Sequence, residues 1–270
     1  MIIRGMLKLL SEIDSHRELL GIMISRTLKI RYKRSALGFF WTLLNPLFFI
    51  IIYAVFLKIL KFYRAGDTLF LPMLVTGVIT WQFTAMCVND SLGSILGNAH
   101  LVAKTTFPRV IFPLSMTVAN LVNFFLSMLI LLAYVLAIGL LGVAPIRFGY
   151  MGLLPVTLLT HVALCLGLAL ILSALNVFFR DTEHIVGVGM LAWFFLTPVI
   201  YDLSYIPEQY QKLAFLNPMT GIVTTYRAAC LGGAIPAPRL VLMSFAIAWM
   251  VCLLGVLFFR RLEDRFVDEF

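Results

Sequence analysis

The stretch LKIRYKRSALGFFWTLLNP, residues 28–46, joins a dense cluster of cations to a long apolar run. The cations are Lys29, Arg31, Lys33 and Arg34, with Arg26 just before them. Cytoplasmic flanks of membrane helices are enriched in Lys and Arg, so the cluster predicts a cytosolic N-terminus and a first span that runs outward. The orientation of every later segment follows from this one.

The composition excludes a soluble globular protein. Of the 270 residues, 61% are hydrophobic and 13% are charged, whereas soluble domains are about half apolar and about a quarter charged. We therefore expect a polytopic membrane protein. The net charge of +8 lies at segment ends and forms no continuous basic face, so membrane orientation explains it better than nucleic acid does. The first apolar run begins near Leu37 and is long enough to span, so no cleaved signal is expected.

Six apolar runs are expected to cross the membrane. They cover about 37–57, 70–89, 111–141, 153–177, 185–201 and 240–259. The third run would be about 46 Å long as a helix, against a hydrocarbon core of about 30 Å, so it must tilt or project. With this assignment the cytosolic segments hold 14 of the 21 Lys and Arg residues, which agrees with both termini in the cytosol.

Between these runs, four segments have patterns of their own. Residues 11–34 have apolar residues at helical spacing and predict an amphipathic helix along the cytosolic surface. Residues 92–113 are polar and broken by glycine and prolines, which indicates a cytosolic loop with room for one short helix. A second cytosolic loop covers 178–184. Residues 210–231 are too interrupted for a span and predict two short helices that dip into the outer leaflet, with a break at Asn217-Pro218.

Few polar or reactive side chains fall inside the apolar runs. A lone histidine there, His161, is either a proton relay or a hydrogen-bonded packing residue, and the second interpretation is favoured. The cysteines are widely spaced and have no C-x-x-C motif, so we expect small core residues and neither a zinc site nor disulfides; they are Cys87, Cys165, Cys230 and Cys252.

Several enzymatic and energy-coupling motifs are missing from the sequence. It contains no G-x-x-x-x-G-K-[ST] loop, no H-E-x-x-H and no G-x-S-x-G, so P-loop nucleotide hydrolysis on this chain is excluded. The expected spans also lack the carboxylate cluster that ion-coupled transporters keep near the midplane. Energy for any transport is therefore expected to come from another chain.

Four separated motifs carry a family resemblance. They are RYKRSALGFFWTLLNPL at 31–47, GNAHLVAKTTFPRVIFPL at 97–114, FFRD at 178–181, and TPVIY…IP…FLNPMTGIV at 197–223. In this order they resemble the membrane subunit of ABC-2 type exporters, above all the bacterial permeases for O-antigen, capsular polysaccharide or teichoic acid. The resemblance covers nearly the whole chain.

The resemblance implies one all-α domain over 1–270. It comprises a cytosolic amphipathic interface helix in 1–36, a six-span bundle in 37–259 with short re-entrant helices between spans five and six, and a cytosolic tail in 260–270. It also implies a homodimer in the bacterial inner membrane, in contact with membrane lipids, with two copies of a P-loop ATPase that bind ATP and Mg. No cofactor on this chain and no nucleic acid partner are expected.

By the same resemblance, one set of residues couples to the ATPase and another closes the outer mouth. The coupling residues lie in the loop at 99–109 and in the second cytosolic loop: Ala99, His100, Leu101, Lys104, Phe107, Arg109, Arg180 and Asp181. The outer helices at 206–231 would form an external gate, with Tyr210, Asn217, Pro218 and Tyr226.

The implied cargo is a glycan on a polyprenyl diphosphate that threads between two subunits. Flat apolar side chains suit sliding sugar rings, and the candidates are Trp41, Trp81, Trp193, Phe194, Phe195 and Tyr201. An interfacial aromatic belt or plain packing would also explain these residues. Arg31, Lys33 and Arg34 lie where a diphosphate would enter, and arginine pairs well with phosphate; membrane orientation alone also explains them.

Two other functions stay open at this point. An exporter of the same fold that moves a drug or a small lipid is poorly separated from a glycan exporter. A membrane-embedded lipid-glycan transferase would need an external base, but the expected outer segments offer only Asp67, Asp202 and Glu208 and no histidine. The transferase is therefore the weaker alternative.

Overall fold

The computed structural model describes residues 11–32, 40–41, 44, 47–48, 51–52, 55, 59, 68–104, 107–142, 149–232 and 237–269. Within these residues the chain forms helices and short connections and no β-strand, in agreement with the all-α prediction. Most of the expected first span at 37–57 lies outside the described residues, and so do Lys33 and Arg34.

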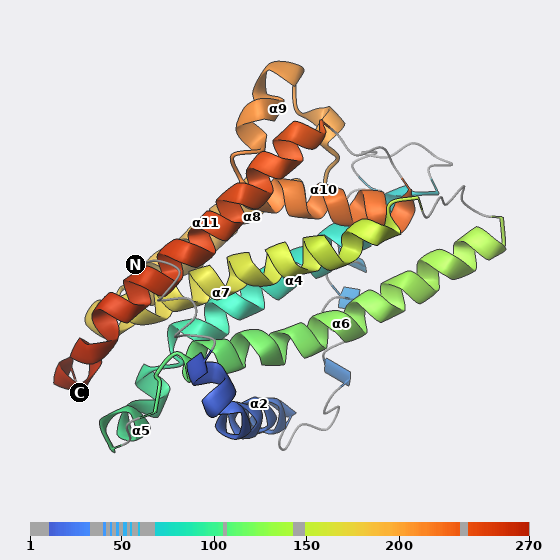
Figure 1. The fold of residues 1–270 in the computed structure, drawn as a ribbon. Helices are drawn as coiled ribbons and strands as arrows, with labels where there is room; N and C mark the ends of the chain where they lie inside the picture. The colour runs from blue at the N-terminus through green and yellow to red at the C-terminus, as the bar shows by residue number, and fades with distance from the viewer. Residues whose placement is uncertain are drawn as a thin grey trace.

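Four long helices form the body of the molecule and lie side by side (Figure 1). Each is long and apolar enough to cross a membrane. They are α4 (Phe70–Leu92), α6 (Ile111–Leu140), α7 (Leu154–Phe178) and α11 (Pro238–Leu262). Each coincides with one of the six expected spans, so long apolar runs were sufficient to predict them.

Helix α8 (Thr182–Leu196) differs from the expected fifth span at 185–201. It begins three residues earlier and ends five residues earlier. Thr197 has an extended backbone, with φ of −100° and ψ of 137°, because the ring of Pro198 disfavours a helical conformation in the residue before it. The prediction of a helix up to Tyr201 was therefore wrong.

The helix at the N-terminal side, α2 (Arg17–Tyr32), packs against α6. Its apolar positions at helical spacing are partly buried, whereas Ile22 and Ile30 on the other side are 63% and 58% exposed. The partly buried positions are Leu19, Leu20, Met23, Ile24 and Leu28. The amphipathic pattern is confirmed, and the structure adds that its apolar face lies against protein.

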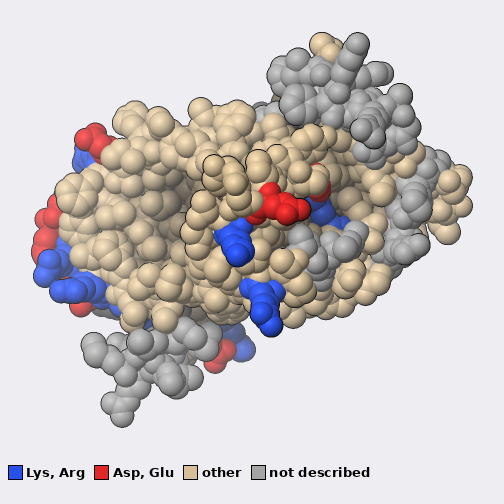
Figure 2. All heavy atoms as spheres, turned by 90° about the horizontal axis from the view of Figure 1, so that it is seen from above, with Lys and Arg blue, Asp and Glu red and all other residues tan. Residues whose placement is uncertain are grey.

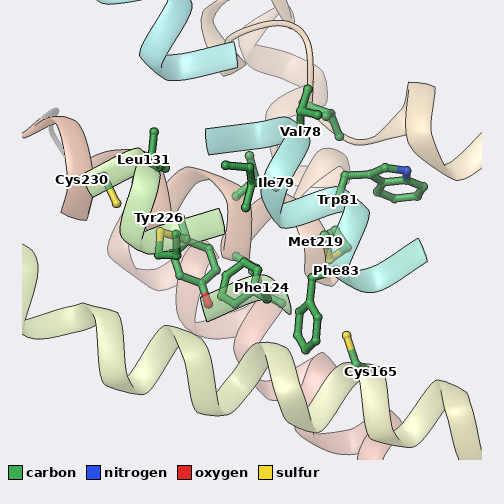
Figure 3. Close-up of a cluster of buried hydrophobic side chains, with 14 of the residues drawn as sticks. Val78, Ile79, Trp81, Phe83, Phe124, Leu131, Cys165, Met219, Tyr226 and Cys230 are labelled. Carbon is green, nitrogen blue, oxygen red and sulfur yellow. The ribbon is translucent and has the colours of Figure 1, made fainter. Parts of the chain in front are cut away.

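The main core lies where α4, α6, α7 and α10 (Pro218–Leu231) meet. Figure 3 shows the Phe83 and Phe124 rings close together, and their centroids are 4.9 Å apart. His161 is fully buried beside these rings, and its Nε2 lies 2.8 Å from Thr84 Oγ1. This geometry fits a hydrogen-bonded packing residue. All four cysteines are free and three are buried, as expected.

The segment between α8 and α11 forms two short helices, α9 (Glu208–Ala214) and α10, with Asn217 between them. The predicted break at Asn217-Pro218 is therefore confirmed. Proline fits the first turn of α10 because its missing N–H would have no helical partner there. Gly232 ends α10 in the left-handed conformation, with φ of 80°, which glycine adopts without steric cost.

One end of the bundle has a second core, and we call it the α5 end. Figure 1 shows α2, α5 (Ala99–Lys104) and the C-terminus together there, with α9 at the opposite end of α11. Phe266 of the closing 3-10 segment η5 (Glu263–Glu269) is fully buried against Phe178 and Phe259. In Figure 2 most of the face shown is uncharged, and charged side chains gather at one end with a smaller group near the middle.

Candidate functional site

A groove of about 560 Å³ runs between α4, α6 and α8. Three of the predicted aromatic platforms line it, namely Trp41, Trp81 and Phe194. The ring centroids of Trp81 and Phe194 are 5.5 Å apart in an edge-to-face arrangement. In Figure 3 the indole of Trp81 projects away from Phe124 and the centre of the core. The groove is open on one side, because Trp41 and Leu191 at its rim are 40% and 62% exposed.

Helical periodicity places amides and a hydroxyl along the same groove. Its polar lining consists of Gln82 and Asn89 on α4 and Asn120, Asn123 and Ser127 on α6. On α4 the lining extends from Val78 to Asn89, a rise of about 16 Å at 1.5 Å per residue. None of the described residues that line the groove is charged. The lining thus offers flat rings and neutral hydrogen-bonding groups along a length of several sugar units.

The other predicted aromatic platforms lie elsewhere. Trp193 packs edge-to-face on Trp81, with centroids 5.5 Å apart, and its Nε1 donates to Asn217 Oδ1 at 2.8 Å. Phe195 is 58% exposed, and its carbonyl accepts a hydrogen bond from the hydroxyl of Tyr201. Three of the six aromatic candidates therefore line the groove, because only one side of α8 faces it.

Asn217 connects the two short helices to α8. Its Oδ1 caps α10 by accepting from Met219 N at 3.0 Å and also accepts from Trp193 Nε1, while its Nδ2 donates to Thr197 Oγ1 at 2.8 Å. Asn217 and Pro218, two of the residues predicted for the external gate, thus lie at the junction of α8, α9 and α10, and Tyr210 is 52% exposed on α9.

Tyr226 does not fit the expected gate position. It is 1% exposed and packs against Phe124 and His161, with ring centroids 5.8 Å apart in both cases. The family resemblance placed Tyr226 at the outer opening, as part of the paired helices at 206–231. Helix α10 instead packs against α4, α7 and α11, which turns this ring into the core.

Replacing Asn217 by alanine is expected to loosen this junction. The change removes an N-cap, which costs about 1 kcal/mol, and two side-chain hydrogen bonds that contribute about 1 kcal/mol each. Thermal unfolding of the detergent-solubilised protein should show a clear loss of stability. Asn217→Asp, which keeps both acceptor contacts, should lose less. Equal stabilities of Asn217→Ala and the unchanged chain would contradict this role.

Sequence reasoning missed Arg227 on α10. Its side chain is buried, and all three guanidinium nitrogens donate to carbonyl oxygens: Nε to Met73 at 3.2 Å, Nη1 to Tyr201 at 2.9 Å and Nη2 to Val199 at 2.7 Å. These carbonyls belong to the first turn of α4 and to the non-helical segment after α8. A cation inside the mildly apolar run 218–231 was the available signal.

At the α5 end the structure divides the predicted coupling residues into two groups. His100, Lys104, Arg180 and Asp181 are exposed. Ala99, Leu101, Phe107 and Arg109 are only partly exposed, and Leu101 and Phe107 pack on the second core. The short helix predicted in this loop is confirmed as α5. The exposed side chains of α5 are those of His100 and Lys104, and Arg180 and Asp181 lie in the connection between α7 and α8.

Arg109 is bound to the C-terminal segment. Its Nη1 donates to the Glu263 carbonyl at 2.6 Å and lies 4.0 Å from Asp264 Oδ1. Nearby, Arg260 forms ion pairs with Glu263 at 2.8 Å and with Glu12 from the N-terminal side. The two ends of the chain and the α5 loop are thus held together by charge-assisted hydrogen bonds.

Comparison with known proteins shows the family of this chain. The family model of ABC-2 type transporters matches residues 18–231. The O-antigen export system permease protein RfbA of Myxococcus xanthus is 33% identical over 250 residues, which cover 90% of this chain and 94% of that protein. The RfbA protein of Klebsiella pneumoniae is 29% identical over 252 residues, covering 93% and 94%.

A more distant relative is the polysialic acid transport protein KpsM of Escherichia coli. It is 24% identical over 213 residues, which cover 78% of this chain and 80% of that protein. The family match covers well over half of the chain and includes the groove helices α4, α6 and α8. The chain therefore belongs to the ABC-2 type transporter family.

Proposed function

We propose that this chain is the membrane subunit of an ATP-driven exporter that moves a lipid-linked polysaccharide outward across the bacterial inner membrane. The observation that carries the proposal is the groove along α4, α6 and α8, with its aromatic and amide lining. Rings and neutral amides bind sugars weakly at many points, and the uncharged lining avoids strong fixed contacts that would stall a moving polymer. The relatives named for O-antigen export and polysialic acid transport support this cargo class.

A second copy of the chain would complete the path. The groove is open at a rim formed by Trp41, Asn89 and Leu191, all of which are exposed. In a homodimer the facing copy would close this side and leave a passage between the subunits. The glycan would follow that passage while its polyprenyl tail stays in the lipid.

The membrane topology that we propose has six spans and cytosolic termini. Four long helices and the shorter α8 supply five apolar helices, and the run at 37–57 would be the first span. Helices α9 and α10 are 7 and 14 residues long, too short to cross a hydrocarbon core of about 30 Å. They would dip into the outer leaflet, where α10 packs on α4, α7 and α11 and its backbone is surrounded by protein, as a non-spanning segment at that depth requires.

The α5 end would bind the ATPase subunits that hold ATP and Mg. Its short helix α5 is anchored on a core shared with α7, α11 and η5. A displacement of α5 by the ATPase would therefore be transmitted to the long helices as a rigid-body movement. The exposed side chains His100, Lys104, Arg180 and Asp181 form the surface available for docking.

Reversing two of these charges is expected to release the ATPase. In the double variant Lys104→Glu/Arg180→Glu both changes are on exposed side chains, and like charges across an interface weaken binding by several kcal/mol. We expect at least about tenfold less P-loop ATPase to co-purify with the tagged chain in mild detergent. Export of the glycan to the cell surface should fall with it.

Lys212→Glu is the matched control, because Lys212 is an exposed lysine on α9 at the far end of α11. It should leave ATPase recovery unchanged. Undiminished recovery with the double variant would refute the docking surface. Recovery of the unchanged chain without any P-loop ATPase, and without nucleotide-dependent export, would refute the proposed function itself.

A further inference from the structure

Arg31 of α2 forms a closed ring of hydrogen bonds with two other side chains, Asp90 and Asn120. Its Nη2 lies 2.5 Å from Asp90 Oδ2 on α4, and its Nη1 donates to Asn120 Oδ1 on α6 at 2.8 Å. The ring closes because Asn120 Nδ2 donates to the same Asp90 oxygen at 2.7 Å. The Arg31 and Asp90 side chains remain 22% and 34% exposed. The guanidinium is thus fixed and still reachable from solvent.

The ring lies at one end of the groove. Asn120 belongs both to the ring and to the groove lining, and Asn89, the neighbour of Asp90, also lines the groove. The direction of α4 places this end of the groove toward α2 and α5 (Figure 1). A molecule that enters the groove from the α5 end would therefore pass the Arg31–Asp90 pair first.

We propose that the Asp90 carboxylate pairs with the Arg31 guanidinium while no cargo is present, in the position that a substrate phosphate would take. When cargo enters the groove, Arg31 exchanges this carboxylate for the diphosphate of the lipid carrier. This inference rests on the proposed function. Carboxylate and phosphate oxygens present the same acceptor geometry to a guanidinium. A diphosphate carries more negative charge than one carboxylate, so it competes effectively for the same donors.

The partial exposure of the pair makes the exchange feasible. A fully buried carboxylate that loses its cation would cost several kcal/mol, because a charge would remain without compensation. Asp90 is one-third exposed and keeps the hydrogen bond from Asn120, so water and the amide can stabilise it after release. Asp90 also keeps Arg31 extended toward the groove while no cargo is present, which reduces the ordering cost of binding.

The two members of the pair should have opposite effects on diphosphate binding. Arg31→Gln removes the cation and should weaken binding of a polyprenyl diphosphate by about tenfold or more. Asp90→Asn removes the competing charge but keeps an oxygen acceptor for Arg31, so it should tighten binding several-fold. Arg17→Gln, an exposed arginine on the same helix, should change neither value.

The test uses the full chain in nanodiscs of neutral phosphatidylcholine. Binding of a polyprenyl diphosphate is compared with binding of the polyprenol of equal length and of phosphatidylglycerol. The expected result is a diphosphate preference that Arg31→Gln abolishes and Asp90→Asn increases. A gain of affinity cannot come from misfolding, so Asp90→Asn decides the question even if Arg31→Gln is unstable.

Weaker diphosphate binding by a folded Asp90→Asn variant would overturn the exchange and make Asp90 a scaffold residue. An equal gain for phosphatidylglycerol would overturn the assignment to the lipid carrier, since any anionic headgroup would then suffice. If the diphosphate preference is not found but ATPase recovery and export are intact, the proposed function is unaffected. Loss of both would refute the function on which this inference rests.

Discussion

Replacing Arg227 by methionine is expected to prevent the chain from accumulating as a folded membrane protein. The backbone carbonyls of Met73, Val199 and Tyr201 would all lose the guanidinium as a donor. The Val199 and Tyr201 carbonyls lie outside helices, and an acceptor without a partner costs about 1–3 kcal/mol, so the total is about 2 kcal/mol or more. Folded proteins have only about 5–15 kcal/mol of stability. Western blotting of membranes and size-exclusion profiles in detergent would measure the loss.

Failure to insert into the membrane cannot explain such a loss. Methionine is far less costly to place in a membrane than arginine, so Arg227→Met makes the segment more apolar. The defect would therefore arise from the carbonyls and not from insertion. Arg227→Lys should have an intermediate effect, because an ammonium is a point donor and cannot reproduce the planar fork of a guanidinium.

Two further variants separate this contact from general effects of charge. Arg239→Met removes an exposed arginine at the start of α11 and should be neutral. Gly77→Ala leaves every charge in place, but its Cβ would lie 2.2 Å from the Val199 carbonyl oxygen and 2.8 Å from Arg227 Nη2. It should destabilise the same contact. Normal accumulation of Arg227→Met would show that the three carbonyls find other donors.

Apolar length and periodicity were sufficient to predict most of the helices. Long apolar runs predict α4, α6, α7 and α11 because a span needs about 20 apolar residues. The i, i+3, i+4 spacing in residues 11–34 likewise identifies which face of α2 becomes buried. These features are local, so a single sequence contains the information.

Contacts between distant segments were not predictable in the same way. The count of Lys and Arg on the two sides of the membrane assigned Arg227 to the outer segments. In the structure it instead reaches backbone carbonyls 154 and 28 residues away. The pairing of Arg31 with Asp90 joins residues that are 59 positions apart. Similarly, three predicted platforms line one groove only because α4, α8 and Trp41 meet there. Such partners depend on how the helices are rotated about their axes, which hydropathy does not specify.

Glycines at helix crossings were a further feature that composition did not reveal. Gly167 of α7 faces the backbone of α11, and an added Cβ would lie 2.6 Å from Cys252 Cα. On the opposite side, a Cβ at Gly255 would lie 2.4 Å from the Gly167 carbonyl oxygen. Small residues let membrane helices approach closely enough for extensive van der Waals packing. The two helices therefore meet backbone to backbone.

Gly167→Leu is accordingly expected to abolish both stability and export. The atoms nearest to the new Cβ are backbone atoms of Val251 and Cys252, so a rotamer change cannot accommodate the side chain and the helices must move apart. Overpacking of this kind costs about 3 kcal/mol, and it would also move α11 away from the core at the α5 end that contains Phe259 and Phe266.

The matched control is Gly187→Leu on α8, where an added Cβ has no atom within 4 Å. The unfolding temperature and the amount of glycan at the cell surface should fall strongly for Gly167→Leu and less for Gly167→Ala. The unfolding temperature of Gly187→Leu should match that of the unchanged chain. Equal stability of the two leucine variants would mean that α7 and α11 separate without cost. In that case the crossing would not fix the position of α11, and the ion pairs of Arg260 with Glu12 and Glu263 would have to hold the core at the α5 end.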